Sequence, residues 1–181
     1  MNRERKKIGL MLALIIITFC GCQNDWKSAF DTQLAELGHR NWIVVADSAY
    51  PSQNSKGITT LVTGESQTEI LTYLLQQIEL SPHVRPKIMF DQELAFVTDQ
   101  DAPGVGSYKE DLNRILGSSE VAEMSHEQII EQLDRASEMY KVLILKTNMT
   151  IPYTSVFINL DCDYWSEDKE KQLRSVMGKA E

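Results

Sequence analysis

Four side chains of the sequence have the types that move protons between oxygen atoms: His39, Asp47, His126 and Tyr153. An imidazole can take or give a proton near neutral pH, and a nearby carboxylate can orient it. A phenol can donate a hydrogen bond to an oxygen of a substrate. These residue types favour acid–base chemistry on hydroxyl groups. The sequence has no GxGxxG or P-loop glycine motif and no GxSxG motif, so nucleotide binding and serine-hydrolase chemistry have no support.

His39 and Asp47 flank one apolar segment. Trp42 to Ala46 is a β-branched run of the kind that lies deep in a sheet, with His39 just before it and Asp47 just after it. Open α/β sheets place their chemistry at the ends of central strands. Asp47 there could orient a histidine, bind a hydroxyl or act as a base. It could equally be a turn-forming residue, because Asp and the following Pro51 both favour turns.

The two histidines are predicted at opposite helix ends. A helix from Lys27 to Leu37 that stops at Gly38 would place His39 at its C-terminus, where the helix dipole favours the charged ring. His126 follows the predicted cap Ser125, at a helix N-terminus that favours the neutral ring. Opposite electrostatic biases would suit an acid and a base. Histidines at helix ends are also ordinary capping or surface residues.

Tyr153 precedes the last predicted strand, Ser155 to Leu160, and is placed there by Pro152. Its hydroxyl could donate to a substrate oxygen, or its ring could simply pack at a strand edge. The following Asp161-Cys162-Asp163 is predicted to be a solvated turn.

Strand and helix signals alternate along the chain. Capping boxes at Ser66, Ser107 and Ser125 predict three helices, and a charged helix is expected from Ser166 to Met177. Strands are predicted at 58–62, 87–90, 94–97 and 142–145, in addition to those already described. The alternation predicts a three-layer α/β domain, a Rossmann-like sheet flanked by helices.

The N-terminus predicts a bacterial lipoprotein signal peptide over residues 1–21. A basic start is followed by an apolar run from Ile8 to Phe19 and by a lipobox-like segment ending at Cys22. Cys22 is then the expected lipidation site, which anchors the protein to a membrane of the cell envelope. The alternative is a buried helix of the domain. Residues 22–28 would be a tether, 29–165 the domain and 166–181 a helical extension.

Without residues 1–21 the chain has 14 basic and 25 acidic residues, a formal net charge of −11. Such a surface repels nucleic acid, which needs clustered Lys and Arg. With Cys22 acylated, only Cys162 remains, so neither an intramolecular disulfide nor a metal site built on paired cysteines is expected.

Three segments in order resemble the RbsD/FucU family of bacterial D-ribose pyranases and L-fucose mutarotases. They are LGHRNWIVVADSAYP from Leu37, SHEQI from Ser125 and IPYTSVFI from Ile151, and the resemblance covers about residues 29–160. It implies a cofactor-independent isomerase that interconverts ring forms or anomers of a free monosaccharide. It also implies a ring-shaped homo-oligomer with sites between subunits, lined by His39, Asp47, His126 and Tyr153.

The resemblance suggests that His39, supported by Asp47, handles one proton and that His126 or Tyr153 handles the other. Some positions depart from the family pattern. Ser155 stands where the family has a sugar-contacting asparagine, Ile130 where the ribose branch often has a lysine, and the usual glutamate before Pro-Tyr is absent. These changes keep open a non-catalytic sugar-binding lipoprotein, and also a purely structural ring-forming role.

Overall fold

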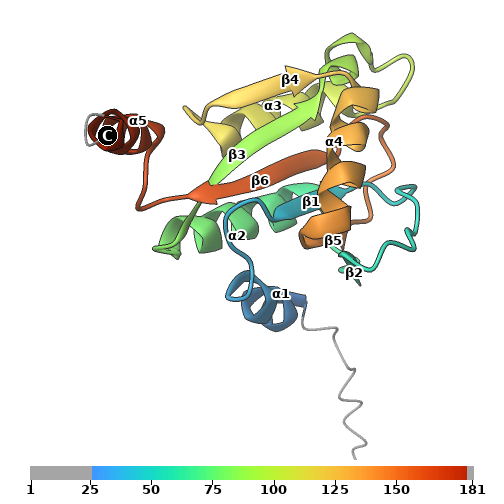
Figure 1. Cartoon of the computed structure of the whole chain (residues 1–181). Helices are drawn as coiled ribbons and strands as arrows, with labels where there is room; N and C mark the ends of the chain where they lie inside the picture. The colour runs from blue at the N-terminus through green and yellow to red at the C-terminus, as the bar shows by residue number, and fades with distance from the viewer. Residues whose placement is uncertain (1–25, 179–181) are drawn as a thin grey trace, which may run out of the picture.

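The computed structural model describes residues 26–178, in which six strands form one mixed sheet with helices on both faces (Figure 1). The strand order across the sheet is β2-β5-β1-β6-β3-β4. The strands are β1 (Trp42–Ala46), β2 (Ile58–Val62), β3 (Val84–Asp91), β4 (Val121–Met124), β5 (Val142–Lys146) and β6 (Val156–Cys162). The helices are α1 (Trp26–Leu34), α2 (Gln67–Leu80), α3 (Val105–Leu116), α4 (His126–Met139) and α5 (Glu167–Met177), with a 3-10 turn η1 (Gln92–Phe96). The predicted three-layer α/β architecture is confirmed.

The direction of the strands brings distant segments to one edge of the sheet. β6 lies between β1 and β3 and runs antiparallel to both. β5 is parallel to β1, and β4 is parallel to β3. The carboxyl ends of β1, β3, β4 and β5 therefore meet at the edge where β6 begins. Residues that follow these four strands and residues that precede β6 are brought together there.

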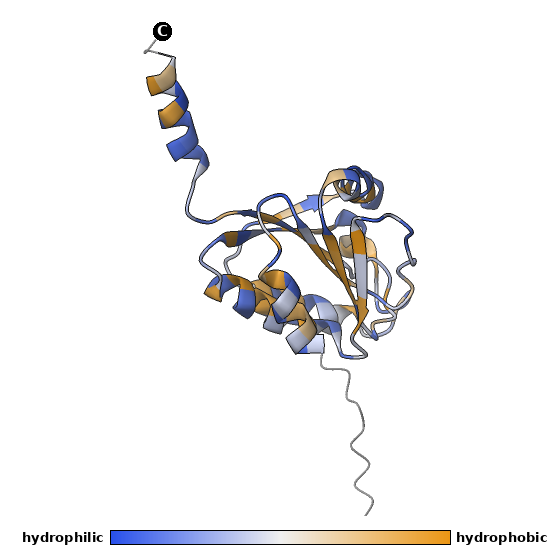
Figure 2. Cartoon of the chain, turned by 60° about the horizontal axis from the view of Figure 1, so that its bottom comes forward, coloured by the Kyte–Doolittle hydropathy of each residue, from blue (hydrophilic) through white to orange (hydrophobic). Residues whose placement is uncertain are grey.

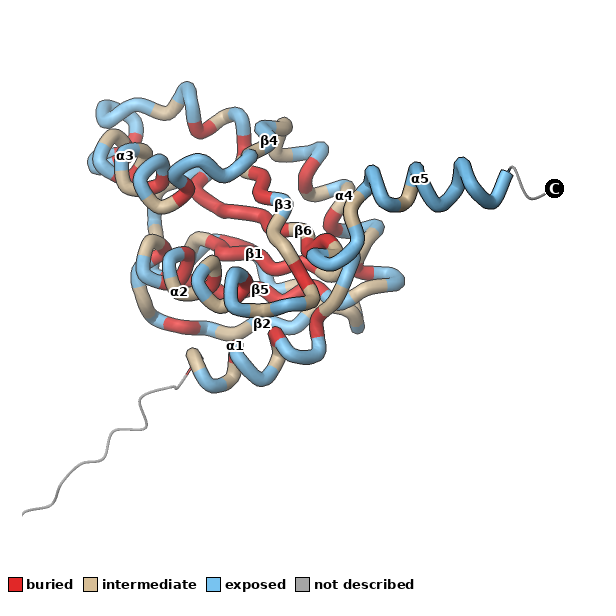
Figure 3. The backbone as a smooth tube through the Cα atoms, turned by 90° about the vertical axis from the view of Figure 1, so that its left-hand side faces the viewer, coloured by how far each residue is buried: buried red, intermediate tan, exposed pale blue. Residues whose placement is uncertain are grey.

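Two apolar layers hold the sheet. All five residues of β1 are buried, and they alternate between the two faces. Ile43 and Val45 pack with α1, α2 and α3, whereas Val44 and Ala46 pack with α4. Figure 2 shows the apolar strands between the helical layers, and Figure 3 shows that the central strands are buried. A fully buried side chain such as Phe157 contributes about 1.5–3 kcal/mol to this core.

Two predicted elements differ in the structure, and one strand is additional. The segment 94–97 is not a strand but lies mostly in the turn η1, and β4 at Val121–Met124 was not predicted. Both differences have the same cause: these segments are short and lie at the rim, where packing rather than residue pattern decides the backbone. The helix α3 begins at Val105 after Gly104 rather than at Ser107. Gly104 has a φ of 95°, a conformation that glycine adopts without strain.

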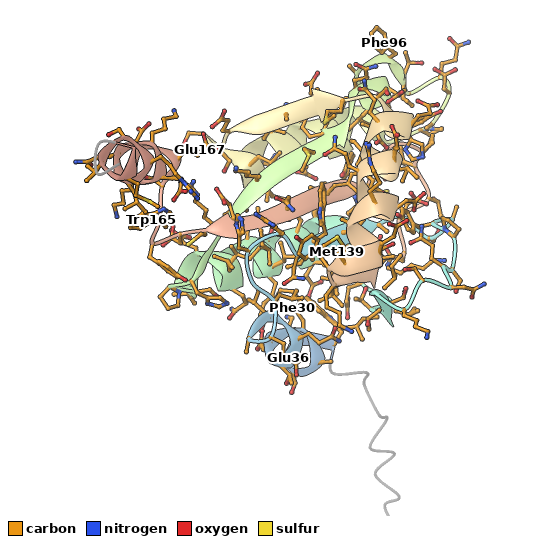
Figure 4. The ribbon with its side chains drawn as sticks, in the orientation of Figure 1. Phe30, Glu36, Phe96, Met139, Trp165 and Glu167 are labelled. Atoms are coloured by element: carbon orange, nitrogen blue, oxygen red, sulfur yellow. The ribbon has the colours of Figure 1, made fainter. Side chains whose placement is uncertain are left out.

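The two ends of the described chain behave differently. α1 begins at Trp26, inside the predicted tether, and the Trp26 ring is buried against Tyr73, with ring centroids 5.2 Å apart. α5 is present as predicted, capped by Ser166, and it stands away from the sheet with no buried residue (Figure 1, Figure 3). Trp165 and Glu167 mark the segment that joins it to β6 (Figure 4).

The predicted signal peptide and Cys22 lie outside the described residues. Within residues 26–178, none of the helices has both the length and the apolar character needed to cross a bilayer.

Candidate functional site

A cavity of about 550 Å³ lies at the sheet edge where the carboxyl ends of the parallel strands meet the start of β6. Three of the predicted site residues line it: Asp47 after β1, His126 at the start of α4, and Tyr153 before β6. The predicted contact residue Ser155 lines it as well. The topology, rather than closeness in sequence, brings these side chains together.

Asp47 is held at the cavity by two hydrogen bonds. Its Oδ1 accepts from the amide of Ala49 at 2.8 Å, and its Oδ2 accepts from the hydroxyl of Ser155 at 3.1 Å. The first bond is the local turn contact expected of an aspartate, and the second crosses to the start of β6. Asp47 is therefore both a turn residue and a positioned carboxylate. The Ser155 hydroxyl donates its one hydrogen bond to Asp47 and therefore does not donate to a ligand.

His126 is fixed by two carboxylates from the neighbouring strand and turn. Its Nδ1 lies 3.0 Å from Asp91 Oδ2, and its backbone amide donates to Glu93 at 3.1 Å. An ionised Asp91 can only accept, so Nδ1 carries the proton of this hydrogen bond. The complete capping box of Ser125 and Gln128 holds the helix start. Because Nδ1 is bonded to Asp91, Nε2 is the ring nitrogen left to act on a ligand.

Asp91 is the buried support of this histidine. It is the last residue of β3, and only 1% of its surface is exposed. Burial raises the pKa of Asp91, and the hydrogen bond and charge of His126 oppose that shift. A buried carboxylate behind an imidazole is the arrangement that orients a histidine for proton transfer.

Tyr153 takes an unusual backbone conformation beside His126. Its φ is 58°, in the left-handed region that side chains other than glycine rarely adopt. The ring meets the His126 ring edge-on, with centroids 5.9 Å apart at 82°. The next residue holds the loop in place, since the Thr154 carbonyl accepts from Tyr108 of α3 at 2.8 Å and also from Gln67 of α2.

His39 lies at the opposite edge of the sheet. The five residues of β1 between it and Asp47 span about 16 Å, so one chain cannot bring the two together. The expectation that Asp47 supports His39 does not hold within the chain. The predicted dipole effect does not hold either, because α1 ends at Leu34, and Gly38 does not adopt the left-handed conformation of a helix stop.

The carboxylate partner of His39 is Asp161. Its Oδ1 lies 3.1 Å from His39 Nδ1, and its Oδ2 accepts from Arg85 at 2.7 Å and lies 3.2 Å from Lys87 Nζ. Asp161 is therefore not in a solvated turn, because it belongs to β6 and is buried. Burial opposes ionisation, but the hydrogen bonds from Arg85, the Cys162 amide and Lys87 outweigh it and lower the pKa of Asp161 to about 2.

Replacing Asp161 with asparagine is expected to lower the free energy of unfolding by about 2 kcal/mol at pH 7, the value that a pKa shift from 3.8 to about 2 implies. Because the folded pKa is depressed, the carboxylate stabilises the fold fully above pH 4. The difference from wild type therefore shrinks as the pH falls from 4 to 2. Urea unfolding across this range measures it, with the exposed Asp163→Asn variant as the control. Equal losses at pH 7 and pH 2 would contradict the assignment.

Family membership is shown by the sequence. The family model described as the RbsD / FucU transport protein family matches residues 27–161. The chain belongs to this family. No curated protein matches the sequence.

The fold is shared with a solved RbsD structure. RbsD of Bacillus subtilis, solved with D-ribose, is 21% identical, and the similarity covers 73% of this chain and 90% of that one with a TM-score of 0.52. The fucose mutarotase of Streptococcus pneumoniae, solved with L-fucose, is 24% identical over 71% of this chain and 87% of that one, with a TM-score of 0.48. The family resemblance drawn from the three motifs is confirmed, and all three motifs contribute residues to the cavity.

Sequence reasoning missed part of this candidate site. Asp91 and Glu93 hold His126, and Tyr50 lines the cavity. The position of Asp91 directly after the apolar run Ile88-Met89-Phe90 was an available signal, the same one that pointed to Asp47. Among residues 26–178, no three His, Cys, Asp or Glu side chains are grouped so that they could hold a metal ion.

Proposed function

We propose that this RbsD/FucU protein is a monosaccharide mutarotase or pyranase, a cofactor-independent isomerase that opens and recloses the ring of a free sugar. The observation that carries the proposal is one cavity in which His126, backed by buried Asp91, faces the same space as Asp47 and Tyr153. D-ribose in the solved RbsD structure supports a free monosaccharide as the substrate class. The cavity of about 550 Å³ has room for a monosaccharide.

The reaction needs two proton transfers and no redox step. A base takes the proton of the anomeric hydroxyl, the bond between the anomeric carbon and the ring oxygen breaks, and an acid gives a proton to that oxygen. Closure on the other face gives the other anomer, and closure by a different hydroxyl gives the other ring size. His126 Nε2 handles one of these protons, because Asp91 fixes the ring through Nδ1. Tyr153 and Asp47 bind and orient the hydroxyl groups.

We propose that His39 of a neighbouring subunit transfers the second proton. Half of the His39 side chain is exposed, and Asp161 orients the ring from behind. We propose a ring-shaped homo-oligomer in which this edge of one subunit closes the cavity of the next. His39 would then reach the cavity of a neighbouring chain. It cannot reach the cavity of its own chain, because β1 lies between them.

Saturation-transfer NMR on D-ribose, L-fucose and other free sugars tests the proposed function. The wild-type protein is expected to accelerate exchange between ring forms or anomers of at least one sugar well above the buffer rate, and His39→Ala is expected to lose that acceleration. Buffer rates for every sugar, with the wild type and His39→Ala alike, would overturn the proposal.

A non-catalytic sugar-binding protein is the second candidate function, and two residues of the cavity lining support it. The Ser155 hydroxyl donates its hydrogen bond to Asp47, and Ile130 lines the cavity where the ribose branch often has a lysine. Calorimetry that shows tight sugar binding without faster exchange would select this alternative.

For either function we propose attachment to the bacterial cell envelope through a lipid on Cys22. The mass of the mature N-terminus tests this attachment.

A further inference from the structure

Two buried polar side chains hold the turn that carries Tyr153. Gln67 is the first residue of α2 and is fully buried, and Tyr108 of α3 is 5% exposed. The Gln67 amide nitrogen donates to the Thr154 carbonyl, and the Tyr108 hydroxyl donates to the same oxygen at 2.8 Å. Both helices lie on the face of the sheet opposite α4, so the turn is fixed from the face that does not carry His126 (Figure 1).

The turn holds Tyr153 in a conformation that a tyrosine rarely adopts. Pro152 followed by a residue with a φ of 58° is the pattern of a type II turn, whose third residue is usually glycine. The Thr154 hydroxyl donates to the Ile151 carbonyl at 2.8 Å and closes this turn. A left-handed conformation of a residue other than glycine persists only when its surroundings enforce it. The two bonds to the Thr154 carbonyl contribute to that enforcement.

Stability alone does not account for Gln67. Its Oε1 is buried and has no hydrogen-bond partner among residues 26–178. The amide cannot turn over to relieve this, because Thr154 offers a carbonyl oxygen, which can only accept. A buried acceptor without a partner costs free energy, whereas an apolar side chain of similar size carries no such cost. Burial also raises the pKa of Tyr108, so its hydroxyl keeps the proton that it donates. What these two polar groups provide is the pair of bonds to Thr154.

We propose that Gln67 and Tyr108 are positioning residues of the proposed isomerase. They hold the Thr154 carbonyl, and the turn then keeps Tyr153 at the cavity and edge-on to His126, with ring centroids 5.9 Å apart. Neither residue lines the cavity, so both act on the sugar only through Tyr153. This inference rests on the proposed function, because it assigns to the same cavity two residues from the other face of the sheet.

The first measurement follows the turn itself and needs no sugar. The rings of Tyr153 and His126 lie close enough for a nuclear Overhauser contact between their protons. Tyr108→Phe combined with Gln67→Met in the full chain keeps side chains of similar size but removes both donors. Tyr153 is then expected to leave the left-handed conformation, and the contact is expected to lose most of its intensity. Tyr108→Phe alone replaces the double variant if the latter does not fold.

The second measurement is sugar exchange by saturation-transfer NMR, with Tyr108→Phe made in two backgrounds. With Tyr153 present, Tyr108→Phe is expected to slow exchange about two- to tenfold, the range of one hydrogen bond. In Tyr153→Gly the turn has the residue that adopts a positive φ without strain, and the side chain to be positioned is gone. Tyr108→Phe is therefore expected to change the rate of Tyr153→Gly by less than about twofold. A purely structural role would slow both backgrounds by the same factor.

A control variant and three outcomes decide the assignment. Tyr73→Phe removes a hydroxyl that donates to Asp31 outside the cavity, so the ring contact and the exchange rate are expected to stay at their wild-type values. A ring contact of wild-type strength in the variants that lack the donors overturns the positioning role, whether or not a sugar is exchanged. Equal slowing in both backgrounds also overturns it and leaves the isomerase proposal standing. A lost ring contact in a protein whose wild type exchanges no sugar overturns the isomerase and supports the hold of Gln67 and Tyr108 on the turn.

Discussion

Replacing His126 with glutamine is expected to slow sugar exchange by about 10²–10⁴-fold, the range that positioned acid–base groups contribute. Glutamine can still donate a hydrogen bond to Asp91, but it cannot carry a proton. The His126 side chain is 41% exposed and lies at the first position of α4, so its replacement removes no core packing. Saturation-transfer rates and thermal unfolding, measured on the same preparation, separate the loss of chemistry from any loss of fold.

Asp91→Asn is the companion variant, because it also disturbs His126 but is expected to raise the stability of the fold. Burial raises the pKa of Asp91 above its ordinary value of 3.8, against the opposing effect of His126. A raised carboxyl pKa means that the ionised form weakens the fold as the pH rises through that pKa. The neutral asparagine is therefore expected to unfold at a higher temperature at pH 7, an advantage that disappears below pH 3.8, while sugar exchange slows.

The opposite result would identify a different role. If Asp91→Asn loses stability at pH 7 and keeps its exchange rate, the carboxylate is a structural anchor of α4 rather than the support of a proton-transfer group. A faster-unfolding His126→Gln with an unchanged rate per folded molecule would likewise remove His126 from the chemistry.

The central elements and the cavity motifs could be predicted from sequence because their signals are local. Trp42 to Ala46 is apolar at every position, so its burial on both faces follows from the residues alone. Ser125 and Gln128 satisfy each other's backbone groups, which fixes the start of α4 and hence His126. The three family motifs also pointed to Asp47, His126 and Tyr153, which the structure places around one cavity.

The remaining features depend on contacts across the sheet. His39 and Asp47 belong to one motif, yet a strand places its two ends far apart, and only the strand order shows what each end meets. The roles of Asp91 and Asp161 depend on His126 and Arg85, which lie 35 and 76 positions away in the sequence. β4 has two exposed residues among its four and is recognisable only through its pairing with β3.

The division of the family motif between two edges of the sheet leads to the second large effect. Each chain has the His126 cavity and, at the far edge of the sheet, a His39 that the cavity of the same chain cannot use. A closed ring of identical subunits can repeat one contact between these two edges at every interface. Every site then contains residues from two chains, and defects in different chains can be separated.

Mixing two inactive variants is therefore expected to restore activity. His39→Ala and His126→Gln each lose at least about 100-fold in sugar exchange when assembled alone. In subunits mixed in equal amounts and assembled together, about a quarter of the interfaces join an intact cavity to an intact His39, so about a quarter of the wild-type rate returns. Co-expression with two affinity tags, followed by saturation-transfer NMR on the doubly purified protein, measures this recovery.

The matched control mixes His126→Gln with Asp91→Asn, whose changes both lie in the cavity of a single chain. No arrangement of these subunits joins two intact halves, so the rate is expected to stay at the level of the better variant alone. Recovery in the control would show that the rate reports something other than shared sites. Absence of recovery in the His39→Ala mixture, with the mixed assembly confirmed by its mass, would place all of the proton-transfer groups in one chain and remove His39 from the site.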